Sequence, residues 1–158
     1  MVYTDSDSDG RALWKVSIDG GNPVRLLKSA DSPAVSPDGK WIACRYPKGH
    51  TDRIAIIPFE GGEPVKLLYC PPEERNAPNR LHWTPDGRAI TYVTRKSGVD
   101  NIWSQPLNGG SAKQLTNFDN YRIYSYGWSL DGKQLVCARG ADIYNIILIT
   151  DSAVEKGL

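Results

Sequence analysis

The segment that most resembles a ligand-binding motif is DSDSDG, close to the N-terminus. Four of its residues fit the first half of an EF-hand calcium loop: Asp5, Asp7, Asp9 and Gly10. An EF-hand also needs a bidentate Glu at loop position 12, where this chain has Val16, and a helix on each side. We therefore expect a plain polar loop that holds no metal. A calcium loop of another type, built from the three Asp side chains, remains the alternative.

Residues suited to nucleophilic catalysis or to a zinc site are scarce. No Gly-x-Ser-x-Gly motif occurs, and the only histidines are His50 and His82. His82 precedes Trp83 in an apolar run, so packing or lining a channel is its expected role. Three cysteines occur at wide spacing: Cys44, Cys70 and Cys137. They form neither a disulfide framework nor a zinc motif. The sequence predicts a protein that is not an enzyme and that needs no cofactor.

The charge balance excludes some classes of partner. There are 19 Lys and Arg against 18 Asp and Glu, a net charge of +1, which gives no electrostatic reason to bind nucleic acid or an anionic membrane. No apolar run approaches the roughly 18 residues that cross a bilayer. No signal peptide is visible at the N-terminus. We expect no nucleic-acid partner and no membrane insertion.

Two short tags recur along the chain with one period. The first occurs as Ser36–Gly39, Thr84–Gly87 and Ser129–Gly132, at steps of 48 and 45 residues. The second is a Gly-Gly pair preceded by Asp19, Glu60 or Asn108. Pro, Asp and Gly suit successive positions of a tight turn, and an Asp-Gly or Asn-Gly pair suits a hairpin. A repeat of about 45 residues is typical of propeller blades.

The runs between the tags predict four strands per repeat, labelled a to d. Strands a end at Val35, Trp83 and Trp128. Strands b are expected at Met1–Thr4, Trp41–Cys44, Ala89–Val93 and Gln134–Cys137. Strands c are expected at Leu13–Ile18, Ile54–Phe59 and Ile102–Leu107, and strands d at Pro23–Leu27, Pro64–Leu68 and Ala112–Leu115. No helical periodicity competes with this pattern. The prediction is an all-β partial propeller of about four meandering blades, over residues 1–28, 29–70, 71–116 and 117–158.

The repeat also assigns roles to the cysteines and tryptophans. Cys44 and Cys137 lie at the same offset from their turn glycines, so we expect two buried thiols that do not bridge. Two pairs of tryptophans share equivalent positions: Trp14 with Trp103, and Trp83 with Trp128. We expect them to pack between stacked blades.

Three segments carry a resemblance to a known family: AVSPDGKWIACRY, LHWTPDGRAITYVT and YGWSLDGKQLVCARG. With their linked Gly-Gly hairpins they resemble the WD-like repeat of TolB-type β-propellers, over nearly the whole chain. The closing ARGADIYNIILITD is similar to the last blade of propellers fused C-terminally to bacterial serine/threonine kinases and transcriptional regulators. The resemblance implies a propeller fold and, in a TolB-like context, a periplasmic or other extracytoplasmic location. It leaves the role open, because this fold serves many functions.

The strand pattern begins inside a strand b and ends before a last strand d, which leaves two blades incomplete. We therefore expect the C-terminal part of a larger propeller, or a part-ring that needs a partner. Unpaired strand edges favour association, and a two-fold dimer is the commonest closed form.

Recognition is expected in the b–c and d–a loops, which vary more than the turns. The longest is Tyr69–Arg80, and another, NFDNYRIYSY, is rich in aromatics and Arg, which favour partner contacts. The candidate residues are Arg80, His82, Phe118, Tyr121, Arg122, Tyr124 and Tyr126. Packing beneath their own loops is the alternative for each. The sequence thus predicts a non-catalytic module that binds a protein, peptide or other ligand. The second hypothesis is the gating propeller of a prolyl-oligopeptidase-type peptidase whose catalytic domain is absent.

Overall fold

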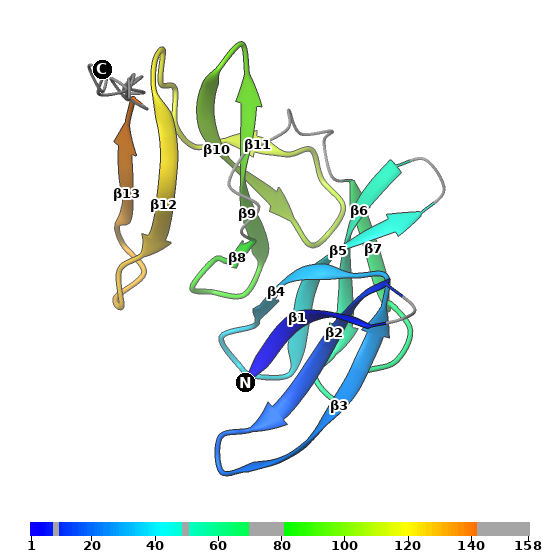
Figure 1. Cartoon of the computed structure of the whole chain (residues 1–158). Helices are drawn as coiled ribbons and strands as arrows, with labels where there is room; N and C mark the ends of the chain where they lie inside the picture. The colour runs from blue at the N-terminus through cyan, green and yellow to red at the C-terminus, as the bar shows by residue number, and fades with distance from the viewer. Residues whose placement is uncertain (8–9, 49–50, 70–80, 142–158) are drawn as a thin grey trace, which may run out of the picture.

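The computed structural model describes residues 1–7, 10–48, 51–69 and 81–141, which form an all-β structure of four antiparallel sheets (Figure 1). We call these sheets blades 1 to 4. Blade 1 contains β1 (Val2–Asp7), β2 (Gly10–Ser17) and β3 (Gly20–Lys28). Blade 2 contains β4 (Asp31–Val35), β5 (Trp41–Lys48), β6 (Thr51–Pro58) and β7 (Lys66–Tyr69). Blade 3 contains β8 (His82–Trp83), β9 (Ala89–Lys96), β10 (Val99–Pro106) and β11 (Lys113–Gln114), and blade 4 contains β12 (Arg122–Trp128) and β13 (Leu135–Gly140). Within these ranges no helix is long and apolar enough to cross a membrane.

Every blade is a meander in which each strand pairs with its neighbour along the chain. The register confirms the predicted alignment of the repeats. Tyr3 lies opposite Trp14 in blade 1, and Tyr92 lies opposite Trp103 in blade 3. Cys44 takes the same place in blade 2, opposite Ala55. Strands a end at Val35, Trp83 and Trp128, as the turn pattern predicts.

The a–b turn of blade 2 closes its own hydrogen bonds. The Ser36 hydroxyl donates to Asp38 Oδ1 at 2.6 Å and accepts the Trp41 N–H at 2.9 Å. The same carboxylate oxygen accepts the Lys40 N–H at 3.1 Å. Gly39 has a φ of 71°, which L side chains rarely adopt. The hydrogen bonds from Ser36 and from the Lys40 N–H lower the pKa of Asp38.

The other two copies of the turn repeat this network. Thr84 and Ser129 replace Ser36, and their hydroxyls donate to Asp86 and Asp131 at 2.7 and 2.5 Å. The turn glycines Gly87 and Gly132 have φ values of 68° and 70°. The third copy forms although Leu130 stands where the others have Pro, because the hydroxyl, the carboxylate and the glycine carry the geometry.

The b–c connections correct one sequence-based expectation. A polar loop is predicted to follow a strand that ends at Thr4, but β1 runs to Asp7 and β2 starts at Gly10. The b–c connections of blades 2 and 3 are also two residues long, and in blade 3 they are Ser97 and Gly98, with φ values of 52° and 80°. Positive φ at both positions suits a tight hairpin turn. Polar residues here continue exposed strand ends, so the b–c connections are uniform and short, whereas the d–a connections differ widely in length.

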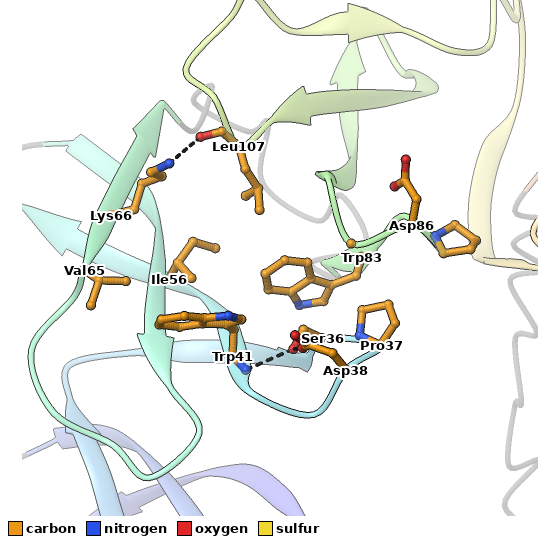
Figure 2. A pocket seen from close by; sticks show the side chains of 12 residues that line it. Ser36, Pro37, Asp38, Trp41, Ile56, Val65, Lys66, Trp83, Asp86 and Leu107 are labelled. Atoms are coloured by element: carbon orange, nitrogen blue, oxygen red, sulfur yellow. Dashed lines mark hydrogen bonds between the residues drawn. The ribbon is translucent and has the colours of Figure 1, made fainter.

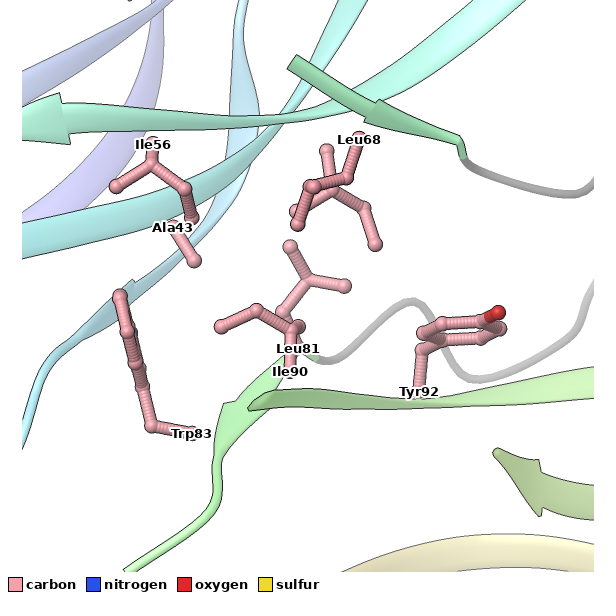
Figure 3. Packing of buried hydrophobic residues seen from close by; sticks show 8 residues of the cluster. Ala43, Ile56, Leu68, Leu81, Trp83, Ile90 and Tyr92 are labelled. Carbon is pink, nitrogen blue, oxygen red and sulfur yellow. The ribbon is translucent and has the colours of Figure 1, made fainter. Parts of the chain in front are cut away.

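The core consists of three apolar clusters, one at each junction between consecutive blades. We call these junctions seams 1–2, 2–3 and 3–4. At seam 2–3, Ala43, Ile56 and Leu68 of blade 2 face residues of blade 3 (Figure 3). The facing side chains are Leu81, Trp83, Ile90 and Tyr92. Burying each Leu or Ile side chain of this cluster stabilises the fold by about 1.5–3 kcal/mol.

Seam 3–4 adds a buried ion pair to its apolar contacts. Arg95 Nε and Nη2 donate to the two carboxylate oxygens of Asp100 at 2.6 and 2.8 Å, and both side chains are at most 5% exposed. Across the seam, Asp100 Oδ2 accepts the Ile123 N–H at 2.9 Å. The Asp100 N–H donates to the Tyr121 carbonyl at 3.2 Å. Strand β12 is therefore fixed to blade 3 by hydrogen bonds as well as by packing.

The cysteines and tryptophans are buried to different degrees. Cys44 is completely buried, and this burial, helped by the nearby charge of Asp31, raises the pKa of its thiol to about 12. Cys137 is also free but only half-buried, against the expectation of two equally buried thiols, and Cys70 lies outside the described residues. Trp83 is buried, whereas Trp14, Trp103 and Trp128 are partly exposed.

Candidate functional site

The acidic residues of the N-terminal motif are only partly described. Asp5 lies in β1, where its carboxylate accepts the Ser6 N–H at 2.8 Å. The side chain of Asp7 and the whole of Asp9 lie outside the described part of the structure. Among the side chains that are described, no three His, Cys, Asp or Glu gather as a metal site would require.

Two of the predicted binding residues meet across seam 3–4. The rings of His82 and Tyr126 lie 4.5 Å apart at a tilt of 58°. The Tyr126 hydroxyl is 3.5 Å from Thr91 Oγ1, and Tyr126 is 7% exposed. This pair belongs to the packing of two neighbouring strands a, β8 and β12.

Four of the remaining candidates lie on or beside the d–a connection that leads into blade 4. Phe118 is partly buried, and the Arg139 guanidinium lies 3.4 Å from the centre of its ring and 6.0 Å from that of Tyr121. Tyr121 and Tyr124 are 52% and 48% exposed, and Arg122 is half-buried. Arg80 lies outside the described residues. The candidates thus separate into packed residues and two exposed tyrosines, and they do not line one pocket.

A pocket of about 650 Å³ lies on the other side of the molecule, where seam 2–3 meets the short turns (Figure 2). We call it the seam groove. Blade 2 contributes Ser36, Pro37, Asp38, Trp41, Ile56, Val65 and Lys66, and blade 3 contributes Trp83, Pro85, Asp86, Gly87 and Leu107. These residues come from the a–b turns, from the ends of strands a and b that flank those turns, and from the ends of strands c and d. The groove therefore opens on the turn side, opposite the variable connections.

Two hydrogen bonds join the blades beside the groove. The Trp83 indole N–H donates to the Ala34 carbonyl at 2.8 Å, from blade 3 to blade 2. Lys66 Nζ donates to the Leu107 carbonyl at 2.7 Å in the opposite direction. Between them, Trp41 and Trp83 both face the groove, and Ile56 lies beside them (Figure 2). Lining residues of the groove therefore also join the two blades.

The walls of the groove carry acidic groups. Asp38 and Asp86 each stand in an a–b turn, one from each blade. Hydrogen bonds from Thr84 and from the Arg88 N–H lower the pKa of Asp86, as their counterparts do for Asp38. Both carboxylates are therefore ionised at neutral pH. Apolar and aromatic surface beside a few fixed polar groups is the usual character of a ligand pocket.

Sequence reasoning missed this groove, although Trp41 gave a signal. The second residue after the turn glycine is Trp41 in blade 2 but Ala89 in blade 3 and Gln134 in blade 4. A large aromatic residue at only one of three equivalent positions is not needed to build the repeat. Trp41 is 36% exposed, which is unusual for a side chain of this size.

Comparison with known proteins supports the fold. No family model matches the chain. The chain is 33% identical over 119 residues to the Tol-Pal system protein TolB of Bordetella pertussis. The aligned region covers 66% of this chain and 26% of that TolB. It is 27% identical over 100 residues to Tricorn protease homolog 1 of Streptomyces coelicolor, covering 58% of this chain and 9% of that protein.

The solved structure of TolB from Acinetobacter baumannii matches with a TM-score of 0.69 at 22% identity. The match covers 86% of this chain and 34% of that one. The chain therefore spans about a third of that structure and about a quarter or less of the curated relatives named above. Meandering antiparallel sheets, turn tags and structural match agree, and they identify the chain as part of a propeller with the TolB-like β-propeller fold.

Proposed function

We propose that this chain is a non-catalytic binding module that takes a segment of a partner protein into the seam groove. The observation that carries the proposal is the open groove of about 650 Å³ with Trp41 36% exposed at its wall. This volume is in the range of ligand sites, and exposed aromatic residues are enriched where proteins bind one another. The similarity to TolB, named for the Tol-Pal system, favours a role in a protein assembly.

Selection of peptides from a displayed random library tests the proposal, followed by calorimetric titration. We expect Trp41→Ala to weaken binding of the selected peptides at least about tenfold, because it removes the exposed aromatic wall. Tyr124→Ser is the matched control, since Tyr124 is 48% exposed on the side of the variable connections. The opposite result would overturn the proposal. If the selected peptides bound Trp41→Ala normally but bound Tyr124→Ser more weakly, the binding site would lie at the variable connections.

The second candidate function is the propeller of a peptidase. It is favoured by the similarity to Tricorn protease homolog 1. In that arrangement the groove would bind a neighbouring domain of the same protein instead of a separate partner. Expression of the complete gene product and assay with fluorogenic peptides distinguishes the two: peptide hydrolysis that depends on a segment outside this chain supports the peptidase.

Self-association remains a prediction of the repeat pattern. Light scattering across a dilution series checks it. A mass that stays at the 17.5 kDa of one chain at all concentrations would contradict it.

A further inference from the structure

The chain's own contacts include a repeated arrangement of a cation over an aromatic ring. At seam 1–2, Lys15 Nζ lies 4.9 Å from the centre of the Phe59 ring. The same ammonium donates to Glu60 Oε2 at 2.5 Å. In blade 1, the Arg25 guanidinium lies 5.9 Å from the centre of the Trp14 ring. Both distances are within the range of cation–π attraction.

The contact at seam 1–2 involves Lys15, Phe59 and Glu60. Seam 2–3 has a different type of residue at each of the three equivalent positions. The repeat places Ile56 where blade 1 has Lys15, and Leu107 where blade 2 has Phe59. Asn108 replaces Glu60 in the same alignment. The built-in cation of seam 1–2 therefore has no counterpart at this position, and seam 2–3 has an open groove there.

The seam groove instead has its own groups that attract a cation. Trp41 offers an exposed indole, and no cation lies over it among the residues that the structure describes. Asp38 uses Oδ1 for both of its hydrogen bonds within the turn, which leaves Oδ2 available. Asp86 uses Oδ1 in the same way. The ammonium of Lys66 is held by the Leu107 carbonyl.

We propose that the seam groove recognises a basic side chain, Lys or Arg, of a partner polypeptide. Its alkyl stem packs on the apolar wall formed by Ile56 and Val65, and its cation lies over the Trp41 indole near Asp38. This inference rests on the proposed function and narrows its partner to a basic segment. A long cationic side chain suits such a site because its stem buries well while its charged end stays hydrated.

Titration of the protein with short peptides tests the inference. The probes are acetyl-Gly-Ala-X-Ala-Gly-amide peptides in which X is Lys, Arg, norleucine or citrulline, and the readout is the NMR resonance of the Trp41 indole N–H. Norleucine keeps the alkyl stem of Lys without its ammonium group, and citrulline is a neutral isostere of Arg. We expect the Lys and Arg peptides to bind about fivefold to tenfold more tightly than their neutral counterparts, and to weaken as salt is raised.

Variants with a matched control separate recognition from folding. Asp38→Asn is expected to weaken binding of the Lys peptide by about threefold or more. Trp41→Leu is expected to abolish it, measured by calorimetric titration because this variant lacks the reporter indole. Asp131→Asn is the control, because Asp131 makes the same turn hydrogen bonds in blade 4 but is not among the groove residues. Equal weakening by Asp38→Asn and Asp131→Asn would contradict the inference, since it would indicate a general effect of turn damage or net charge.

The outcomes distinguish this inference from the proposed function. Equal binding of the norleucine and Lys peptides at Trp41 would leave a peptide-binding groove but overturn its preference for basic residues. If no peptide moved the Trp41 resonance, both the groove's function and this inference would fail. A Trp41 resonance that shifted with protein concentration alone would identify a second copy of the chain as the occupant, which would also overturn the inference.

Discussion

Blade 4 is hydrogen-bonded to a buried ion pair of blade 3, whereas blades 2 and 3 meet through an apolar cluster beside an open groove. At seam 3–4, Asp100 binds Arg95 within its blade and the Ile123 N–H across the seam. At seam 2–3, the hydrogen bonds across the seam come from Trp83 and Lys66, at the margin of the groove. Buried charges require partners with good geometry, so they leave little room for a gap. Apolar contacts have no such directional requirement, and a seam built mainly from them can keep space for a ligand.

The largest expected effect comes from breaking the polar seam. Asp100→Ala leaves Arg95 buried without this carboxylate and removes the acceptor of the Ile123 N–H. We expect the free energy of unfolding to fall by about 3–5 kcal/mol, as measured by urea unfolding. The double variant Arg95→Met with Asp100→Leu removes both charges and is expected to lose less than the single variant. A loss below about 1 kcal/mol for Asp100→Ala would mean that the ion pair does not hold the seam.

A second comparison concerns two equivalent turn glycines, Gly132 at seam 3–4 and Gly87 at seam 2–3. A Cβ on Gly132 would lie 2.8 Å from Cβ of Pro85 in the preceding blade, whereas a Cβ on Gly87 would approach Pro37 no closer than 3.9 Å. Both positions have positive φ, so any L side chain is strained there. We expect Gly132→Val to cost about 2–4 kcal/mol and Gly87→Val about 1 kcal/mol, because only the first adds overlap across the seam. Thermal unfolding of both variants measures the difference, and equal losses would contradict the closer approach at seam 3–4.

The fold could be predicted from the sequence because its signals are local. The hydroxyl, carboxylate and glycine of each a–b turn interact within a few residues, so Ser36, Asp38 and Gly39 specify the turn wherever they recur. The predicted equivalence of Trp14 and Trp103 likewise agrees with the strand register, since each lies opposite a tyrosine of strand b. The predicted b–c loops were wrong because charged residues such as Asp5 can continue an exposed strand.

The candidate site could not be predicted because it depends on contacts between blades. Tyr126 is polar and aromatic, as a binding residue would be, yet its ring packs on His82 from the neighbouring blade. Trp41 looked like one more strand residue, and only the position of Trp83 across seam 2–3 makes it part of a groove. A single repeat carries no information about the space between repeats.

A substitution at the apolar seam 2–3 is expected to lower the free energy of unfolding less than Asp100→Ala does at seam 3–4. Trp83→Phe keeps most of the buried ring but removes the indole N–H that binds the Ala34 carbonyl. We expect a loss of about 1–2 kcal/mol, less than for Asp100→Ala, because a neutral hydrogen bond contributes less than a buried charge pair. Urea unfolding measures the loss. A cost equal to that of Asp100→Ala would show that the two seams depend on polar contacts to the same degree.

The smallest expected effect concerns the acidic wall of the groove and its dependence on pH. The folded pKa of Asp38 lies below its unfolded value of 3.8, so its ionised form stabilises the native turn. This contribution is present above about pH 4 and is lost as the pH falls through the folded pKa. We expect the stability difference between the wild type and Asp38→Asn to shrink between pH 5 and about pH 2.5, measured by urea unfolding at each pH. A difference that stayed constant over this range would mean that the carboxylate charge does not stabilise the turn.

The meander has a consequence for how the chain folds. Each strand pairs with its neighbour in sequence, so the loops that must close are short and the entropy lost in closing them is small. Chains dominated by such near-neighbour contacts fold faster than those that must join distant segments. During synthesis, the hydrogen-bond ladder of one blade can form before the next blade has emerged from the ribosome. Each completed blade then offers an apolar face on which the following one assembles.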